Sequence, residues 1–376
     1  MLKVMTIIGT RPELIKMSRV IAEFDHHTRH VLVHTGQNYD YELNQVFFED
    51  LDIRKPDYFL EAVGDNATQT IARVIEKADE VLAAEMPDAV MLYGDTNSCL
   101  AVISAKRRKV PVFHMEAGNR CFDQRVPEEL NRKVLDHLSD INLVLTEHAR
   151  RYLVAEGIRP ETIIKTGSHM REVLNYYMPK IQASDVLQRM QLERGRYFIV
   201  SAHREENVDS EENLRDLLET LNALTEAYDL PVIVSTHPRT RKRLDTLLGL
   251  ELDARIQFMR PFAFCDYIHL QMESLCVISD SGTITEEASL LNLSAITIRN
   301  AHERPEGMDA GTLIMAGLKK NRVLDAVRIT VAQHTREKAA VRPVLDYENP
   351  SVSKQVLRIV ESYTDYVNRT VWRKAL

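Results

Sequence analysis

Short apolar segments that alternate with helix-like segments are the feature of this sequence that most constrains its fold. In the first half of the chain these segments are 3–8, 30–35, 89–92, 110–115 and 141–146, and in the second half 197–201, 232–236, 256–258, 275–279 and 294–298. Short strands separated by helices and buried on both faces are typical of parallel sheets that are covered on both sides. The two series predict two Rossmann-type sheets rather than one large sheet.

The length and rhythm of the chain indicate two domains. At 376 residues it is too long for one ordinary core. The strand rhythm resets near Gly167, which predicts an N-terminal domain over 1–167 and a C-terminal domain over 168–354, with a final helix at about 355–376 packing back on the first domain. The predicted class is α/β, with two Rossmann-type parallel-sheet domains facing an interdomain cleft. Ligands of such sheets bind at the carboxyl ends of the strands.

The composition excludes several classes of protein. The chain is 44% hydrophobic and 27% charged, with a formal net charge of -7. This charge argues against a nucleic-acid partner, because binding nucleic acid requires many phosphates to be neutralised. The basic runs at 106–109 and 239–243 contain no aromatic residues, so we interpret them as solvated helix ends.

The cysteines and the apolar content favour a cytoplasmic protein. The four cysteines lack metal-ligand spacing, and we interpret them as reduced thiols in a reducing compartment. The sequence begins with a strand-like run rather than a leader, and it contains no apolar stretch of 18 residues. We therefore expect neither a membrane partner nor a metal site.

The turn after the first apolar run is a candidate anion site. Gly9 allows a tight turn and Pro12 suits the first turn of a helix. Exposed amides at the helix start, with Arg11 and Lys16 beside them, would bind an anion; the alternative is an ordinary turn with a solvated arginine. The chain contains neither a GxGxxG nor a GxxxxGK[ST] loop, which disfavours NAD and ATP chemistry. No cofactor is expected.

Carboxylates follow three further segments of the first half. Asp95 comes directly after one apolar run and Glu116 ends the next, at the edge of a parallel sheet where catalytic groups collect. Asp95 could alternatively cap the helix that follows. Glu128 and Glu129 open a helix, where one of them could simply favour the helix dipole while Arg132 pairs with the other or faces a ligand.

The second half supplies hydroxyl groups and cations at its strand ends. His203 and His237 each follow an apolar run. The turn at 279–287 has the character of a phosphate cradle, because its backbone amides and the hydroxyls of Ser281 and Thr283 lie at a helix start. A glutamate one turn further along can accept hydrogen bonds from ribose hydroxyls, and the segment 299–306 adds cations.

Several of these segments together resemble one enzyme family. They are GTRPELIK (9–16), GDTNS (94–98), EAGNR (116–120), PEELNR (127–132), SDSGTITEE (279–287) and HERPEG (302–307). Their order over nearly the whole chain resembles that of the non-hydrolysing UDP-N-acetylglucosamine 2-epimerases. The resemblance implies a glycosyltransferase-B-like fold, a UDP-linked 2-acetamido sugar as substrate, a homodimer and C2 epimerisation without a cofactor.

The resemblance also implies roles for individual residues. Catalysis or diphosphate handling is implied for Lys16, Asp95, Glu116, Glu128, Arg132 and His203. Nucleotide binding is implied for Arg11, Ser281, Gly282 and Glu287, with Tyr267 near the uracil. The strand-end positions add His237, Thr283 and Arg304 to the candidate UDP-binding residues. Asp280 and Glu286 are interpreted as structural neighbours.

Two departures from the family's common form bear on the substrate. The segment 36–41 replaces a Gln-His pair that is associated with an allosteric UDP-N-acetylglucosamine site, and Thr283 replaces a glycine. Together with 119–123, these features resemble the subgroup that converts UDP-2-acetamido-2,6-dideoxy-L-talose to UDP-N-acetyl-L-fucosamine for capsule and O-antigen synthesis. Epimerisation of UDP-N-acetylglucosamine to UDP-N-acetylmannosamine and a glycosyltransferase activity are the alternatives, and allosteric activation is left open.

Overall fold

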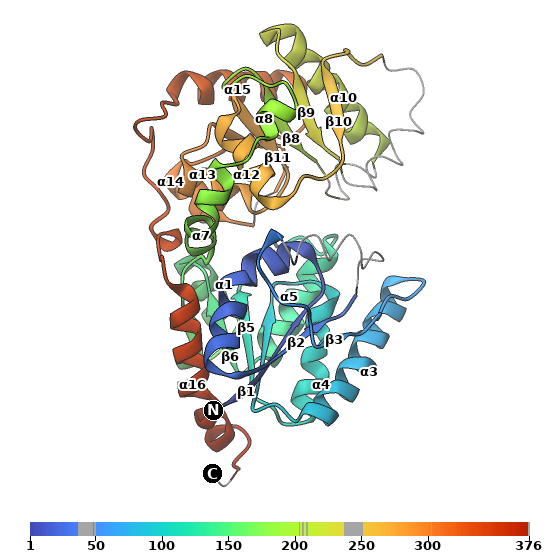
Figure 1. Ribbon diagram of the computed structural model, residues 1–376, viewed down its shortest axis with the longest axis vertical. Helices are drawn as coiled ribbons and strands as arrows, with labels where there is room; N and C mark the ends of the chain where they lie inside the picture. The colour runs from blue at the N-terminus through green and yellow to red at the C-terminus, as the bar shows by residue number, and fades with distance from the viewer. Residues whose placement is uncertain are drawn as a thin grey trace. The chain divides into compact units, whose positions relative to one another are not determined.

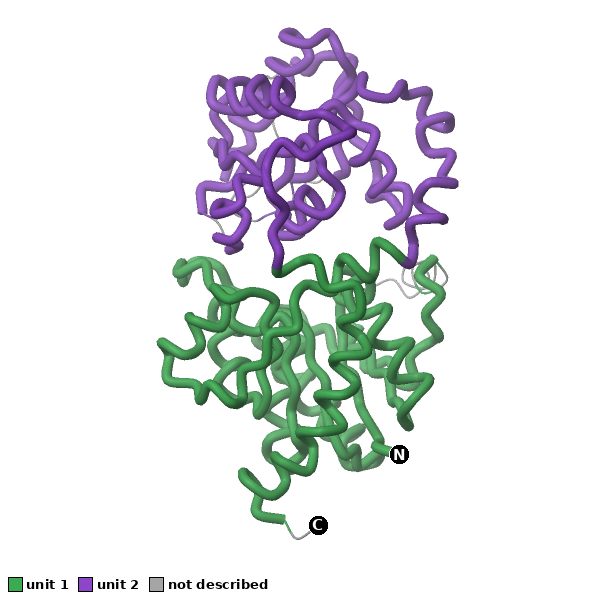
Figure 2. The backbone as a smooth tube through the Cα atoms, turned by 90° about the vertical axis from the view of Figure 1, so that its left-hand side faces the viewer, with its two compact units in different colours: residues 1–175, 346–376 green, residues 176–345 purple. Residues whose placement is uncertain are grey.

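The backbone forms two compact units, coloured green and purple in Figure 2. The computed structural model describes residues 1–36, 48, 50–202, 204, 207, 210–236, 251–301 and 303–374. Unit 1 comprises residues 1–175 and 346–376, and unit 2 comprises residues 176–345. The assignment of folding domains with boundaries at 167 and 354 stays a prediction.

Unit 1 contains a seven-stranded parallel sheet in the order β3-β2-β1-β4-β5-β6-β7. Its strands are β1 (Lys3–Ile8), β2 (Arg29–His34), β3 (Tyr58–Phe59), β4 (Ala89–Tyr93), β5 (Val112–Ala117), β6 (Ile141–Val144) and β7 (Ile163–Lys165). The strand order reverses between β1 and β4, which makes this pair the switch point where such sheets bind ligands.

Helices cover both faces of the sheet in unit 1, with α1 and α16 on one side and α3 and α4 on the other (Figure 1). The helices are α1 (Arg11–His27), α3 (Ala67–Glu85), α4 (Val102–Arg107), α5 (Pro127–Leu138), α6 (Glu147–Ala155) and α16 (Val352–Thr370), with short 3-10 turns at Asn97–Ala101, Pro160–Thr162 and Leu345–Tyr347. α16 packs against α1. Both sheet faces are apolar and buried, as the sequence pattern predicts.

Unit 2 contains a six-stranded parallel sheet in the order β10-β9-β8-β11-β12-β13. Its strands are β8 (Phe198–Ser201), β9 (Val232–Ser235), β10 (Ile256–Met259), β11 (Cys276–Ser279), β12 (Ala295–Thr297) and β13 (Ile314–Met315). The order reverses between β8 and β11, so the switch point of unit 2 is equivalent to that of unit 1.

The helices of unit 2 pack on an apolar core built from both faces of this sheet. They are α8 (Val186–Arg189), α10 (Glu211–Tyr228), α12 (Phe264–Glu273), α13 (Ile284–Leu291), α14 (Pro305–Ala310) and α15 (Lys320–Gln333). The chain passes from unit 1 to unit 2 within α7 (Met170–Gln182).

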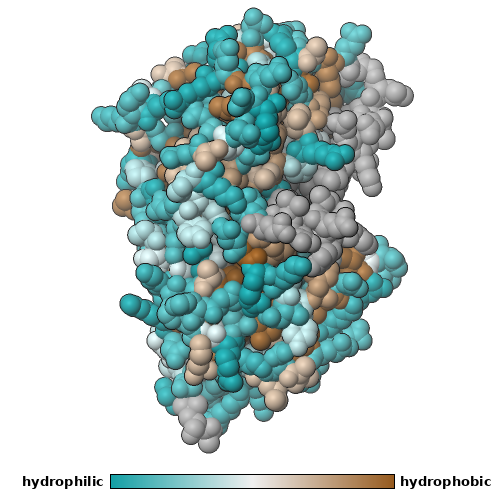
Figure 3. Space-filling view, in the orientation of Figure 1, coloured by the Kyte–Doolittle hydropathy of each residue, from teal (hydrophilic) through white to brown (hydrophobic). Residues whose placement is uncertain are grey.

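All ten predicted strands are confirmed, whereas β3, β7 and β13 were not predicted. None of the four cysteines, which all lie in described parts of the chain, forms a disulfide. Within the described ranges, every helix is too short or too polar to cross a lipid bilayer. Hydrophilic residues cover most of the face shown in Figure 3.

Candidate active site

The turn between β1 and α1 is tightly packed. A Cβ at Gly9 would lie 1.8 Å from the Ser98 Oγ and 2.3 Å from the Thr35 Oγ1, so this position requires glycine. α1 then begins with Thr10 as its N-cap and Pro12 in its first turn, both of which favour a helix start.

Glu13 joins this turn to the loop that follows β4. Its Oε2 accepts hydrogen bonds from the amides of Gly9 (2.6 Å) and Thr10 (3.1 Å), and its Oε1 accepts one from the Thr96 hydroxyl (2.6 Å). The side chain is buried. Burial raises the pKa of Glu13 to about 7, against the opposing effect of these hydrogen bonds. Glu13 therefore holds the loop that carries Asp95.

Glu116 lies on a bulge in β5. The register of β5 against β6 shifts between Met115 and Ala117, and Glu116 has a φ of +66°, in a region that residues other than glycine rarely adopt. A bulge re-aims the side chain that it carries, and backbone strain of this kind is typical of functional sites.

The bulge directs Glu116 at two donors. Its Oε2 lies 2.7 Å from the Lys16 Nζ, and the two side chains are only 11% and 7% exposed. The Tyr93 hydroxyl donates to the same oxygen. Lys16 thus reaches from α1 to β5 and Tyr93 from the end of β4, so three neighbouring elements fix the Glu116 carboxylate.

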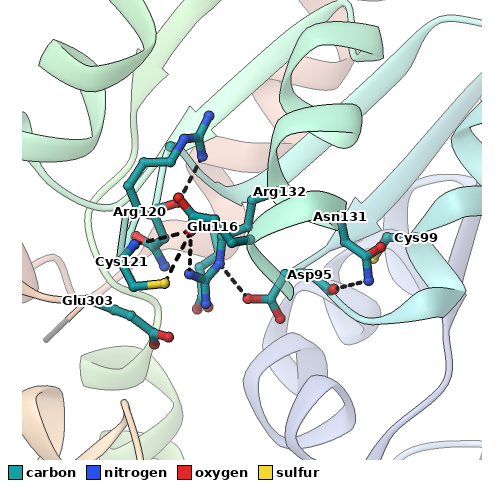
Figure 4. A network of polar contacts seen from close by, with 12 residues as sticks. Asp95, Cys99, Glu116, Arg120, Cys121, Asn131, Arg132 and Glu303 are labelled. Atoms are coloured by element: carbon teal, nitrogen blue, oxygen red, sulfur yellow. Dashed lines mark hydrogen bonds and ion pairs between the residues drawn. The ribbon is translucent and has the colours of Figure 1, made fainter. Parts of the chain in front are cut away.

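Asp95 is paired with Arg132 of α5. The Arg132 Nε lies 2.8 Å from Asp95 Oδ2, and its Nη1 lies 3.1 Å from Glu129 Oε2. The Asn131 side chain donates to the Asp95 carbonyl at 2.9 Å. Figure 4 shows Arg132 and Asn131 both directed at the Asp95 segment. The short helix after Asp95 has Thr96 as its N-cap, so the carboxylate of Asp95 does not serve as its cap.

Of the two glutamates that open α5, Glu129 is the partner of Arg132. It is 1% exposed and accepts hydrogen bonds from the amides of Cys121 (3.1 Å) and Phe122 (3.2 Å). Glu129 therefore anchors both the loop after β5 and the side chain of Arg132. Glu128 is half-buried.

Buried ionic contacts support the same loop from beneath. Asp136 accepts hydrogen bonds from Arg120 Nη1 (2.7 Å) and His114 Nδ1 (2.9 Å), and Arg120 also pairs with Glu156 (2.6 Å). Burial by itself would raise the pKa of Asp136, but the hydrogen bonds and charges of His114 and Arg120 hold it below the ordinary value. The loop is thus fixed by buried charge pairs rather than by packing alone.

The switch point of unit 2 carries hydroxyls and cations. The Ser281 Oγ lies 3.0 Å from the Thr283 Oγ1 and accepts a hydrogen bond from the Thr283 amide at 3.4 Å. A Cβ at Gly282 would lie 3.5 Å from the Glu303 Oε2, 3.7 Å from the Arg304 Nε and 3.9 Å from the Arg204 Nη2. Hydroxyls, backbone amides and guanidinium groups at the start of α13 form an arrangement suited to phosphate.

Two glutamates hold the arginines of this cradle. Glu303 pairs with Arg204 (3.3 Å) and Arg299 (3.1 Å), and Glu286 pairs with Arg304 (3.2 Å). Except for Arg204, these side chains are largely buried. The geometry fixes the guanidinium groups before any anion binds, which favours recognition of a diphosphate.

Glu287 is held one turn further along α13. Its Oε2 accepts a hydrogen bond of 2.8 Å from the buried side chain of Gln271 on α12. Tyr267 lies one turn before Gln271 on the same helix, and burial, together with the nearby Glu287 carboxylate, raises the pKa of its hydroxyl. Glu287 and Tyr267 therefore flank the cradle.

Comparison with known proteins decides the family of the chain. The sequence model of the UDP-N-acetylglucosamine 2-epimerase family matches residues 22–361. The chain belongs to this family. A UDP-N-acetylglucosamine 2-epimerase from Rickettsia bellii is similar in structure, with 61% identity, complete coverage of both chains and a TM-score of 0.95.

Two further members of the family differ in the sugar that their names give. The Methanocaldococcus jannaschii UDP-GlcNAc 2-epimerase, solved in complex with UDP-GlcNAc and UDP, is 30% identical over 96% of this chain and 100% of its own, with a TM-score of 0.88. A UDP-2,3-diacetamido-2,3-dideoxy-D-glucuronate 2-epimerase from Pseudomonas aeruginosa is 33% identical over 88% of this chain and 93% of its own. The predicted glycosyltransferase-B-like fold class, with two parallel-sheet α/β units, is confirmed by the structural neighbours.

The structure places the candidate residues of the family as follows. In unit 1 it brings Lys16 together with Glu116 and Asp95 together with Arg132. Arg11 begins α1, where burial lowers its pKa to about 10 and the nearby Asp50 acts against that shift. In unit 2 it gathers Ser281, Gly282, Thr283 and Arg304, with Glu287 and Tyr267 beside them. His203, His237 and the segment 37–41 lie outside the described residues.

Sequence reasoning missed several residues of these two sites. Tyr93 and His169 contact the Glu116 cluster, and Gln271 holds Glu287. The position of Tyr93, directly before Gly94 at the end of a strand, could have signalled it. Within the described ranges, no group of three or more His, Cys, Asp or Glu side chains is arranged to hold a metal ion.

Proposed function

We propose that this protein is a non-hydrolysing epimerase that inverts C2 of a UDP-linked 2-acetamido sugar. The observation that carries the proposal is the pair of anchored carboxylates, Asp95 and Glu116, at the ends of neighbouring strands in a chain of the 2-epimerase family. Such groups are needed for proton transfer at carbon.

The reaction follows from the chemistry of C2. No carbonyl adjoins C2, so its proton is not acidic until the C1 substituent leaves. As the C1–O bond to UDP breaks, positive charge at C1 acidifies the C2 hydrogen, and a carboxylate removes that proton to leave a glycal and UDP. Protonation of C2 from the other face and re-addition of UDP at C1 give the epimer.

The residues of the two units divide this work. We assign the proton transfers to Asp95, Glu116 and Glu128, because a base on one face and an acid on the other are required. We assign the departing diphosphate to the cradle at Ser281 and Gly282, whose amides and neighbouring arginines stabilise negative charge. Lys16, Arg132 and His203 are proposed to restrain the diphosphate. The residues proposed to bind the rest of UDP are Arg11, His237, Tyr267, Thr283, Glu287 and Arg304.

The sugar that we propose is UDP-2-acetamido-2,6-dideoxy-L-talose, converted to UDP-N-acetyl-L-fucosamine for capsule and O-antigen synthesis. The sequence features at 36–41, 119–123 and Thr283 support it. UDP-N-acetylglucosamine is the alternative substrate, because relatives of similar identity are named for different UDP-sugars. A cytoplasmic homodimer is part of the proposal on the family resemblance, and light scattering of the purified chain tests its mass.

Proton NMR in heavy water tests the activity. The enzyme is incubated separately with the 6-deoxy-L-talo sugar nucleotide and with UDP-N-acetylglucosamine, and we expect the first to be epimerised with deuterium at C2. Conversion of UDP-N-acetylglucosamine alone would favour the alternative substrate. Epimerisation without deuterium at C2 would rule out the elimination mechanism. Consumption of the sugar nucleotide only in the presence of an added acceptor, with no deuterium at C2, would indicate a transferase.

A further inference from the structure

Two hydrogen-bond donors converge on one oxygen of the Glu116 carboxylate. The Tyr93 hydroxyl and the Lys16 Nζ both donate to Oε2. Tyr93 is 2% exposed, and the Lys16 Nζ lies 5.5 Å from the centre of its ring. Two buried side chains thus hold the Oε2 atom of Glu116.

A buried histidine, His169, lies next to the Tyr93 hydroxyl. The His169 Nε2 lies 3.3 Å from the Tyr93 hydroxyl oxygen, and the two rings meet edge to face at 5.2 Å. Since the hydroxyl proton of Tyr93 goes to Glu116, its oxygen accepts from Nε2–H of His169. This requires the tautomer protonated at Nε2 and produces a chain of hydrogen bonds, His169 to Tyr93 to Glu116 Oε2.

Backbone contacts fix His169 in this chain. The amide of Ser168 donates to the Asp346 carbonyl at 3.0 Å, and the Ser168 Oγ accepts from the amide of Met170 at 3.1 Å. His169 itself is fully buried. The donor behind Tyr93 is thus part of a rigid segment at the start of α7.

We propose that Tyr93 is a positioning residue for the Glu116 carboxylate and that His169 orients its hydroxyl. The inference rests on the proposed epimerisation, in which Glu116 transfers a proton. Its basis is the convergence of two buried donors, the Tyr93 hydroxyl and the Lys16 ammonium, on one oxygen of a residue with a strained backbone, which a tyrosine needed only for packing would not require. Tyr197 illustrates the packing case, because its hydroxyl donates to the Leu270 carbonyl at 2.6 Å within the core.

Tyr93→Phe tests this role, because it removes only the hydroxyl. We expect kcat to fall about 10-fold near neutral pH with KM changed less than about 2-fold, since a hydrogen bond to a charged group is lost. The acidic limb of the kcat/KM profile should move upward by about one pH unit, because the ionised carboxylate loses a donor.

Tyr58→Phe is the matched control. The Tyr58 hydroxyl also donates to a glutamate of unit 1, Glu85, at 2.5 Å, from the edge strand β3. Its removal should leave kcat and the pH profile unchanged. Circular dichroism of both variants checks that the fold is retained.

The histidine is tested in two backgrounds. His169→Gln retains an N–H donor at a position similar to Nε2 and should keep most of the activity, whereas His169→Leu should lower kcat about 3-fold to 5-fold. Once Tyr93 is phenylalanine, His169→Leu should cause no further loss, because its effect passes through the hydroxyl. An equal loss in both backgrounds would overturn the role of His169.

NMR titration of carboxyl-13C-labelled glutamate separates this inference from the proposed function. Glu116, assigned from the signal lost in Glu116→Gln, should titrate at a higher pH in Tyr93→Phe than in the wild type. An unmoved titration and pH profile would overturn the inference even if the wild type epimerises its substrate. If the titration of Glu116 moves in Tyr93→Phe but the wild type epimerises no UDP-sugar, the proposed function is refuted and the positioning role of Tyr93 is not.

Discussion

In unit 1 the strands on either side of the switch point, β1 and β4, end beside Asp95 and the Lys16–Glu116 pair. In unit 2 the corresponding strands, β8 and β11, end beside the hydroxyl of Ser281 and a set of arginines that includes Arg304. The two sheets share one strand order around these points. The chemistry at the same topological position is nevertheless opposite: cations fix carboxylates in unit 1, and carboxylates fix cations in unit 2.

Topology therefore determines where a site lies, and the loops determine what it does. The arginines of unit 2 are held by Glu303 and Glu286, and they are proposed to bind the diphosphate. The carboxylates of unit 1 are held by Lys16 and Arg132, and they are proposed to transfer protons at carbon. Substitutions of the unit 1 carboxylates should therefore affect turnover, and substitutions in the cradle of unit 2 should affect nucleotide affinity.

The largest expected effect comes from Asp95→Asn and Glu116→Gln in unit 1. Each removes a carboxylate assigned to proton transfer, so kcat should fall on the order of 1000-fold. The affinity for UDP should stay within about 3-fold of the wild type. Deuterium incorporation at C2 and isothermal titration with UDP measure the two quantities on the same preparations.

Asp79→Asn is the matched control for Asp95→Asn. Asp79 also pairs with an arginine of unit 1, Arg108, at 2.6 Å, but both side chains lie on the surface. It should leave kcat unchanged. A loss of UDP affinity as large as the loss of turnover in Asp95→Asn would break the division between the units.

A smaller effect is expected from Glu13→Gln, which probes how the carboxylate loop of unit 1 is anchored. The pKa of Glu13 is raised to about 7 in the folded chain by burial, against an ordinary value of 4.5. The folded state keeps the proton between these pH values while the unfolded state releases it, so the free energy of unfolding falls as pH rises through this window. The glutamine variant should lack this fall, which is on the order of 2–3 kcal/mol between pH 5 and pH 8.

Urea titrations at both pH values measure this difference. Glu76→Gln, at an exposed position on α3, is the control and should keep the pH dependence of the wild type. If Glu13→Gln also keeps the pH dependence, the proton is not held by Glu13.

The sequence predicted the layered fold because the repeated alternation of apolar strands with helices produces a strong signal, but it missed three short strands at sheet edges, β3, β7 and β13. β3 (Tyr58–Phe59) and β13 (Ile314–Met315) have two residues each, too few for any periodic pattern. Their pairing depends on the neighbouring strand, as in the register of Val33 with Tyr58. Short edge strands are determined by tertiary contacts that no local window contains.

The site was predicted only in part, because some of its features also depend on tertiary contacts. Asp95 and Glu116 could be found from their places at strand ends, but the bulge that re-aims Glu116 arises from pairing between β5 and β6. The partner of Arg132 was ambiguous, since Glu128 at i,i+4 and Glu129 at i,i+3 both suit a helix face; burial selects Glu129. His169 lies 76 positions from Tyr93, and only the fold brings them together.

The smallest effect is expected from Ser281→Ala, which tests the assignment of the unit 2 cradle to nucleotide binding. The Ser281 hydroxyl lies at the start of α13, 3.0 Å from that of Thr283, and it is assigned to the diphosphate. Its loss removes one neutral donor, so the Kd for UDP should rise about 5-fold to 10-fold, which corresponds to about 1 kcal/mol for one typical hydrogen bond. kcat at saturating substrate should stay within about 2-fold.

Ser289→Ala, further along the same helix, separates binding from stability. The Ser289 Oγ accepts a hydrogen bond of 2.9 Å from the Val344 amide, so this change should lower the free energy of unfolding by about 1 kcal/mol without altering the Kd for UDP. If Ser281→Ala instead lowered kcat with UDP affinity intact, the hydroxyl would belong with the carboxylates of unit 1 in function. The opposite chemistry of the two switch points would then no longer correspond to a division between turnover and nucleotide binding.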